Sequence, residues 1–342
     1  TGIGHDALEN VSTGSYNTAM GRDAGRNITT GSSNICIGQN AADADNHIGV
    51  VAVGSFALTS NTADYNTAIG YFASRVNTSG ASNTAVGSNS LEANTTGSYN
   101  TAVGRSSLIT NTTANYNTGL GYAALYANTA AENTAVGSNS MVTNSTGIKN
   151  AALGAWSLRY NTTGDYNTAA GYQALTANTT ADSNSAFGYN TLQANTTGAQ
   201  NSAFGSTALD ANTTGNYNVA IGYDALGSNT TANSNTAVGY EAMDTNTTGE
   251  NNVAIGKGAL DGNTTANDNT AVGYHALLTN STGVKNTAVG ALSLDASTTS
   301  DKNSAFGYAA LGANTTGSDN TALGAYSLLA NTTGTYNVAV GQ

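Results

Sequence analysis

The sequence predicts an all-β fold, a parallel β-solenoid of about 20 coils with a repeat of 17 residues. Glycine marks the repeat: 21 glycines, from Gly4 to Gly341, bound 20 intervals, of which three are 16 residues long and the rest 17. Helical-hairpin repeats need about 33 residues or more, so a 17-residue unit fits one coil of stacked strands instead. The chain also contains no proline, which would remove a ladder hydrogen bond wherever it occurred in a strand.

The consensus unit is Asn-Thr-Ala-Val-Gly-Tyr-x-Ala-Leu-x-x-Asn-Thr-Thr-Gly-x-x, and it runs through residues 1–342 as a single repeat domain. Asn-Thr-Ala-Val-Gly is the best strand candidate, and Asn-Thr-Thr-Gly and Ala-Leu provide the corner and the return side. The segment 38–54 lacks both of the latter motifs and is an irregular coil. Because the chain begins and stops inside the repeat, we expect a segment of a longer fibre protein.

Alternation along the strand places Thr and Val on one face and Asn, Ala and Gly on the other. Val replaces Thr at Val219, Val253 and Val338, so we expect the Thr/Val face to line the interior, with the leucine of Ala-Leu packing against it. The alanine position stays small in nearly every coil, which indicates close approach by another copy of the chain or a tight cross-section within one chain. The expected self-association face is Ala68, Ala85, Ala102, Ala135, Ala169, Ala186, Ala203, Ala220, Ala237, Ala254, Ala271 and Ala288.

The asparagine that opens each strand predicts a ladder of amide hydrogen bonds along the axis of the coil. At its clearest the strand reads Asn218-Val219-Ala220-Ile221-Gly222 and Asn252-Val253-Ala254-Ile255-Gly256. These units resemble the Ser-Val-Ala-Ile-Gly repeat of trimeric autotransporter adhesin heads and the Asn-Thr-Ala-Ile-Gly repeats of phage tail-fibre-like proteins. The resemblance implies a trimeric fibre outside the cell, on a cell surface or a virion, that serves as a shaft or an adhesive head.

Asn-x-Ser/Thr sequons recur at nearly one register of the coil, and two interpretations stay open. They are either a row of glycans along a filament or corners in which Asn and Thr shape the turn. The glycosylation candidates are Asn10, Asn27, Asn77, Asn94, Asn111, Asn144, Asn161, Asn178, Asn195, Asn212, Asn229, Asn246, Asn263, Asn280, Asn314 and Asn331.

Tyrosines recur on both sides of the strand, where they either contact a host glycan or receptor or cover the corners and stack between coils. In the irregular coil, Asp43, Asp45 and His47 alternate and would share one face of an extended segment, which makes them a weak metal candidate against a solvated loop.

Composition excludes several classes of function. The formal net charge of −11 and the nine Lys and Arg residues argue against nucleic-acid binding, and no apolar run reaches the roughly 20 residues needed to enter a membrane. The three histidines are scattered and charged groups are sparse, so we expect no enzyme and no cofactor. The sequence therefore predicts a structural or adhesive extracellular fibre segment. A glycan-coated filament and, less favoured, an ice-binding solenoid are the alternatives.

Overall fold

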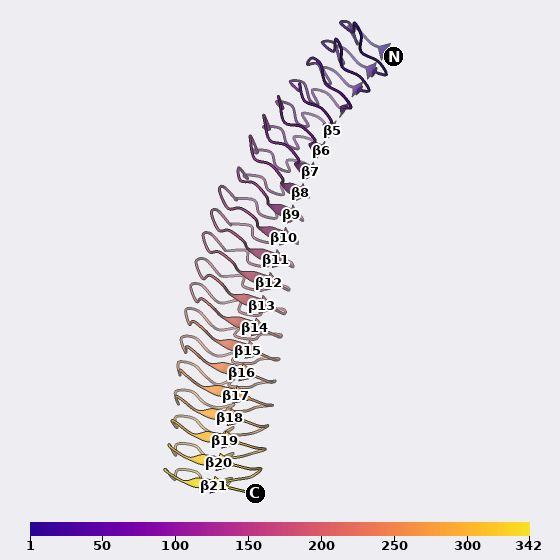
Figure 1. Ribbon diagram of the computed structural model, residues 1–342. Helices are drawn as coiled ribbons and strands as arrows, with labels where there is room; N and C mark the ends of the chain where they lie inside the picture. Colours follow the sequence, from indigo (N-terminus) through magenta and orange to yellow (C-terminus); the bar gives the residue numbers. More distant parts are fainter. The chain divides into compact units, whose positions relative to one another are not determined.

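The computed structural model describes residues 1–342 as two compact units, Thr1–Asn167 and Thr168–Gln342. Each unit is a parallel β-solenoid in which every coil contributes one short strand, and successive strands pair along the chain (Figure 1). The predicted fold class and the 17-residue spacing are therefore confirmed. The strands of the first unit are β1 (Gly2–Ile3), β2 (Thr18–Met20), β3 (Ile35–Ile37), β4 (Val51–Val53), β5 (Thr67–Ile69), β6 (Thr84–Val86), β7 (Thr101–Val103), β8 (Thr118–Leu120), β9 (Thr134–Val136) and β10 (Ala151–Leu153).

The second unit contains eleven strands built on the same coil. They are β11 (Thr168–Ala170), β12 (Ser185–Phe187), β13 (Ser202–Phe204), β14 (Val219–Ile221), β15 (Thr236–Val238), β16 (Val253–Ile255), β17 (Thr270–Val272), β18 (Thr287–Val289), β19 (Ser304–Phe306), β20 (Thr321–Leu323) and β21 (Val338–Val340). The structure contains no helix that could span a membrane.

The coil of residues 83–99 shows why each strand stops after three residues. Thr84–Val86 pairs in register with Thr101–Val103, and Gly87 then turns the chain with a φ of 130°. A Cβ atom on Gly87 would lie 2.7 Å from the carbonyl carbon of Gly104 in the next coil. Both the positive φ and this close approach require glycine, so the glycine spacing sets the repeat.

Left-handed backbone recurs beyond the glycines, at positions that the sequence did not reveal. In this coil Asn89, Leu91 and Tyr99 have φ values of 58°, 50° and 59°. Each of their N–H groups donates to a carbonyl of a neighbouring coil, at 2.9 Å for Asn89 and Leu91 and at 3.1 Å for Tyr99. The strained turns therefore add hydrogen bonds between coils on the return side and at the corner, which offsets a conformation that is costly for residues other than glycine.

The strand alternation is as expected, but the faces are reversed. Ala85 is fully buried, whereas Thr84 and Val86 lie on the outer surface of the sheet and are only half-buried. The leucine of the return side is interior as predicted, although it faces the alanine wall instead of the valine column. The fully buried leucines and methionines of this column are Leu58, Leu91, Leu108, Leu125, Met141, Leu158, Leu175, Leu192, Leu209, Leu226, Met243, Leu260, Leu277, Leu294 and Leu311.

Two columns of asparagine complete the interior. Nδ2 of Asn100 donates to Oδ1 of Asn83 at 3.2 Å, as the predicted amide ladder requires, and the backbone N–H of Asn100 donates to the same oxygen at 2.9 Å. At the corner, Nδ2 of Asn94 donates to Oδ1 of Asn77 at 2.6 Å and to the carbonyl of Gly97 at 2.9 Å. Asn83 Nδ2 donates to the same carbonyl at 2.8 Å, so the two ladders meet inside the coil.

The 16-residue coils shorten at the corner. In 17-residue coils the corner asparagine donates to the carbonyl three residues later, as Asn94 does, whereas Asn61 and Asn128 donate to the carbonyls of Ala63 and Ala130, two residues later, at 2.7 Å. In the segment 38–54, β4 still pairs with its neighbours β3 and β5. The stack thus absorbs a missing residue without losing the strand register.

Candidate interaction surface

The structure offers surfaces rather than clefts, because no pocket opens in it. The most regular surface is formed by the first and third residues of strands β2–β21, which point outward, and we call it the outer sheet face. Its first column consists of Thr, Ser, Val, Ile and Ala, and its third-position column of Val, Ile, Leu, Met, Phe and Ala. Neither column contains a charged residue, so the face is uncharged and combines polar with apolar side chains.

The third-position column exposes large apolar side chains to solvent. Ile69 is 40% exposed, Leu120 43% and Phe204 40%. Phe187 and Phe204, on the neighbouring strands β12 and β13, stack with ring centroids 4.8 Å apart. Single exposed apolar residues need no explanation, but here they recur as a column in each of the two units.

Sequence reasoning missed this face, although the signal that finds it was available. A solvent-facing position is expected to vary through charged residues, and the outer sheet face never does. The alanine column is uncharged for a simpler reason. The alanines are buried within their own chain, as Ala85, Ala186 and Ala271 illustrate with no exposed area.

The expected self-association face is therefore corrected, because none of its members reaches the surface of the coil. The alanines are small because the coil is thin, and the leucine and asparagine columns occupy the rest of its interior. The corrected positions are Ala68, Ala85, Ala102, Ala135, Ala169, Ala186, Ala203, Ala220, Ala237, Ala254, Ala271 and Ala288.

Tyrosine columns flank the outer sheet face on both sides. Tyr99 and Tyr116, which precede strands, are 56% and 59% exposed, and their rings stack with centroids 5.2 Å apart. Tyr223 and Tyr240, which follow strand glycines, stack at 5.3 Å. Lys257 places its Nζ 5.3 Å from the Tyr240 ring centroid. Stacking between coils thus occurs as expected, while contact with a receptor stays a prediction.

The sequon asparagines are mostly interior, which decides between their two interpretations. Nδ2, the atom that would carry a sugar, is used within the corner ladder, as in Asn212, where it donates to Asn195 Oδ1 at 2.8 Å and to the Gly215 carbonyl at 3.0 Å. The following threonine also has a structural role, since Thr213 Oγ1 donates to the Thr230 carbonyl at 3.0 Å. The corner interpretation accounts for the motif.

Three of the sixteen candidate glycosylation asparagines are not buried. Asn10 and Asn27 are exposed, and Asn331 in the last coil is half-buried. A continuous row of glycans is incompatible with the folded coil, and that expectation is corrected. The buried positions are Asn77, Asn94, Asn111, Asn144, Asn161, Asn178, Asn195, Asn212, Asn229, Asn246, Asn263, Asn280 and Asn314.

The metal candidate of the irregular coil does not assemble. Asp45 is exposed and its Oδ1 accepts hydrogen bonds from Thr29, while His47 is fully buried. The alternation argument required an extended segment, but Ala42 and Asn46 have left-handed backbone. Neither ring nitrogen of His47 has a hydrogen-bond partner, and burial lowers the pKa of the imidazole because it disfavours the charged form.

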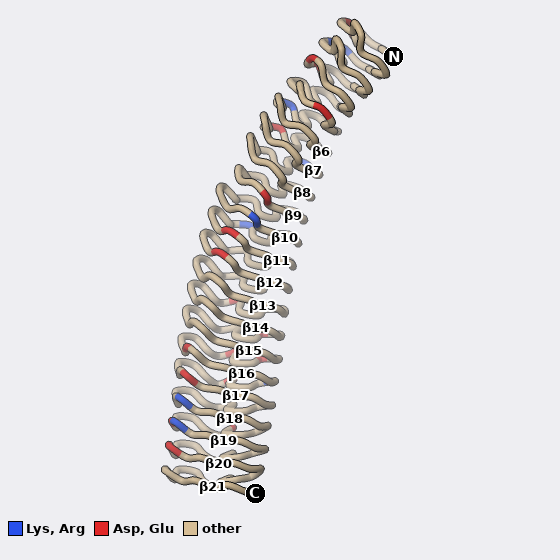
Figure 2. The backbone as a smooth tube through the Cα atoms, viewed as in Figure 1, with Lys and Arg blue, Asp and Glu red and all other residues tan.

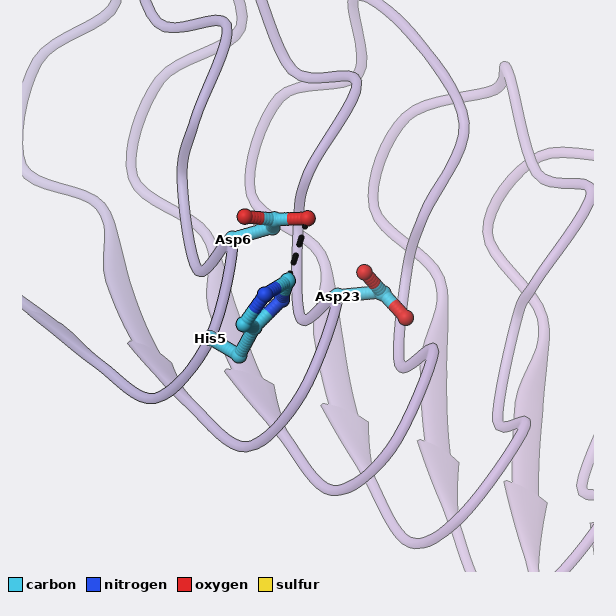
Figure 3. Close-up of side chains that lie close together, drawn as sticks. All are labelled: His5, Asp6 and Asp23. Carbon is cyan, nitrogen blue, oxygen red and sulfur yellow. Dashed lines mark ion pairs between the residues drawn. The ribbon is translucent and has the colours of Figure 1, made fainter.

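The structure does bring His5, Asp6 and Asp23 together at the first two coils (Figure 3). Nδ1 of His5 lies 3.1 Å from Asp6 Oδ2. Asp23, however, already pairs with Arg22 at 3.5 Å and with Arg26 at 3.7 Å, and these cations oppose a metal ion at the same carboxylate. The cluster is accounted for as a surface ion-pair network.

A second acidic group lies in the second unit. Burial, together with the charge of Asp224, raises the pKa of Asp210 and of Asp244 to about 6. Gly227 leaves room between Asp224 and Asp244, since a Cβ atom on it would lie 2.6 Å from Asp244 Oδ1 and 2.7 Å from Asp224 Oδ1. These carboxylates make stability depend on pH.

No protein-family model matches this chain, and no curated protein is similar to it.

Proposed function

We propose that this chain is a structural, non-catalytic segment of an extracellular fibre, a spacer of the kind found in phage tail fibres or bacterial surface adhesins. The observation that carries the proposal is the continuity of hydrogen bonding from coil to coil at the strand, the return side and the corner. In the coil of residues 83–99, Thr84, Leu91 and Thr95 all donate backbone N–H groups to the next coil at 2.8–2.9 Å.

Such a coil resists bending and stretching through many small contributions. Each hydrogen bond adds about 1 kcal/mol net, and each coil contacts only its neighbours, so stability grows with the number of coils. Adjacent strands lie about 4.8 Å apart, so each coil extends its unit by that distance. A repeat of this kind sets length by copy number, which is what a spacer requires.

The remaining parts of the proposal rest on composition and resemblance. The resemblance of the Asn-Val-Ala-Ile-Gly strands to surface-fibre repeats supports a location on a cell surface or virion. The exposed tyrosine columns support contact with a host glycan or receptor by part of the fibre. A trimeric assembly stays a prediction.

Removal of whole coils tests the spacer role. Deletion of residues 201–268, which are four 17-residue coils of the second unit, joins Gln200 to Asn269 in the original register. We expect unchanged circular dichroism per residue and a particle about 20 Å shorter by small-angle scattering. Deletion of residues 201–208, half a coil, is the matched control and should disrupt the second unit. Loss of structure after the four-coil deletion would refute the proposal.

One observation favours ice binding as a second candidate. The threonine column faces outward, contrary to the sequence expectation, and five consecutive strands, β5–β9, begin with Thr. Against this, side chains in the next column range from Ala170 to Phe187, which makes the face uneven. Thermal hysteresis that is lost in Thr84→Lys/Thr118→Lys would support this candidate, and ordinary freezing of the parent protein would eliminate it.

A further inference from the structure

We propose that the corner ladder of the second unit binds one buried water molecule at the place where Ser297 interrupts it. In a regular coil the corner asparagine accepts at Oδ1 from Nδ2 of the next corner asparagine, as Asn246 does from Asn263 at 2.8 Å. Seventeen residues after Asn280 the chain has Ser297 instead, and a serine cannot supply that amide donor. The site lies in the interior of the coil and is independent of the spacer role.

The first observation is an unpaired oxygen inside the coil. Asn280 is fully buried, and its Oδ1 has no hydrogen-bond donor within the protein. Reversal of the amide does not provide one, because Nδ2 already donates to Asn263 Oδ1 at 3.2 Å and to the Gly283 carbonyl at 2.9 Å. Asn111 Oδ1, the other buried corner oxygen without a donor, also precedes an irregular corner, that of Asn128. Interruption of the ladder is therefore what leaves the oxygen unpaired.

The second observation is a hydroxyl hydrogen that is left to donate. Ser300 Oγ accepts from Asn303 Nδ2 at 2.9 Å and from Asn314 Nδ2 at 3.3 Å, which uses both of its acceptor positions. Ser300 therefore donates its own hydrogen to Ser297 Oγ, which is 2.6 Å away. The hydroxyl hydrogen of Ser297 then has no acceptor within the protein, so it is available to a bound molecule.

The size and charge of the corner select water. Ser297 is fully buried at the position of a ladder asparagine, and the difference in volume between the two side chains is about that of one water molecule, roughly 30 Å³. Figure 2 shows charged residues as isolated positions along the coil, and no Asp or Glu is buried. The site thus suits a neutral molecule that accepts from the Ser297 hydroxyl and donates to Asn280 Oδ1, and two such partners are enough to hold a buried water.

Restoring the amide tests the proposal. Ser297→Asn/Ser300→Ala gives the corner the sequence Asn-Thr-Thr-Ala, which residues 263–266 already have within an uninterrupted ladder. Thr299→Ala, at an exposed position of the same corner, is the control. Oxygen-17 magnetic relaxation dispersion of the full chain counts the long-lived water molecules that it binds, and circular dichroism establishes that each variant is folded.

We expect the double variant to bind one long-lived water molecule fewer per chain than the parent, because the introduced amide donates directly to Asn280 Oδ1. Thr299→Ala should bind as many as the parent. A high-resolution crystal structure of the parent should show a water within about 3.2 Å of both Asn280 Oδ1 and Ser297 Oγ. Equal counts for the parent and the folded double variant, or an ordered parent corner with no water between these two atoms, would overturn the proposal. Neither result bears on the coil-deletion test of the spacer role.

Discussion

The corner asparagine ladder should be a principal source of stability, and Asn212→Ala measures it. Asn212 is fully buried, donates from Nδ2 to Asn195 Oδ1 and to the Gly215 carbonyl, and accepts at Oδ1 from Asn229 Nδ2 at 2.9 Å. The three bonds have different fates after substitution. The Gly215 carbonyl keeps a donor, Asn201 Nδ2 at 2.8 Å, and Asn229 keeps the Ala232 carbonyl at 3.2 Å.

Asn195 Oδ1, in contrast, loses its hydrogen-bond donor inside the coil. Two lost bonds at about 1 kcal/mol each and one stranded acceptor at about 1–3 kcal/mol predict a loss of about 3–5 kcal/mol. Guanidinium denaturation followed by circular dichroism gives the free energy of unfolding. Thr214→Ala, at an exposed position of the same corner, should change it by less than about 0.5 kcal/mol. A loss below about 1 kcal/mol for Asn212→Ala would show that the ladder is incidental.

Three further predictions concern the core and pH. Leu226→Met should lower the free energy of unfolding by less than about 1.5 kcal/mol, since Met243 occupies the equivalent position with the same left-handed backbone. Leu226→Ile should lower it more, because branching at Cβ conflicts with a φ of 54°. Equal denaturation midpoints for the two variants would contradict this. The pKa of His47 is lowered from its ordinary 6.5, so the stability contributed by its neutral form is fully present above pH 6.5 and decreases as the pH falls toward the pKa of the folded chain. His47→Asn should remove this pH dependence from the hydrogen exchange of peptides from residues 1–167. The pKa values of Asp210 and Asp244 are raised from 3.8 to about 6, so their contribution to stability is fully present below pH 3.8 and is lost as the pH rises through about 6. If the free energy of unfolding of Asp210→Asn/Asp244→Asn depends on pH as that of the parent does, this prediction is wrong.

The sequence was sufficient for the fold class because the repeat imposes it, but it could not orient the strand. Alternation specifies which residues share a face, and a one-residue change of register exchanges interior and exterior. Val219 suggested an interior column because valine is usually buried, yet the thin coil has room only for Ala220 on the inner side. Packing distance between the walls, which no local pattern encodes, decided the outcome.

The left-handed leucines were beyond prediction for a related reason. A leucine with a φ near 50° is rare, and an Ala-Leu pair carries no sequence signal that predicts this conformation. Leu226 adopts it because its N–H then reaches the Ala242 carbonyl of the next coil at 3.0 Å while its side chain enters the core. Such a gain exists only once neighbouring coils are stacked. The asparagine ladder was easier to anticipate, since amide stacking follows directly from a strictly repeated Asn.

The glycine that ends each strand has a consequence for how such a chain evolves. A Cβ atom at Gly222 would lie within 2.6 Å of the backbone of Gly239, so the fold does not accommodate another residue at the strand-ending glycines. Every coil nevertheless presents the same upper and lower edge, so gain or loss of a tandem block of seventeen codons creates no new junction. The corners at Asn61 and Asn128 show that the fold also accommodates a coil one residue shorter there. Lineages carrying this repeat should therefore diverge in the number of blocks faster than in the residues that stack them.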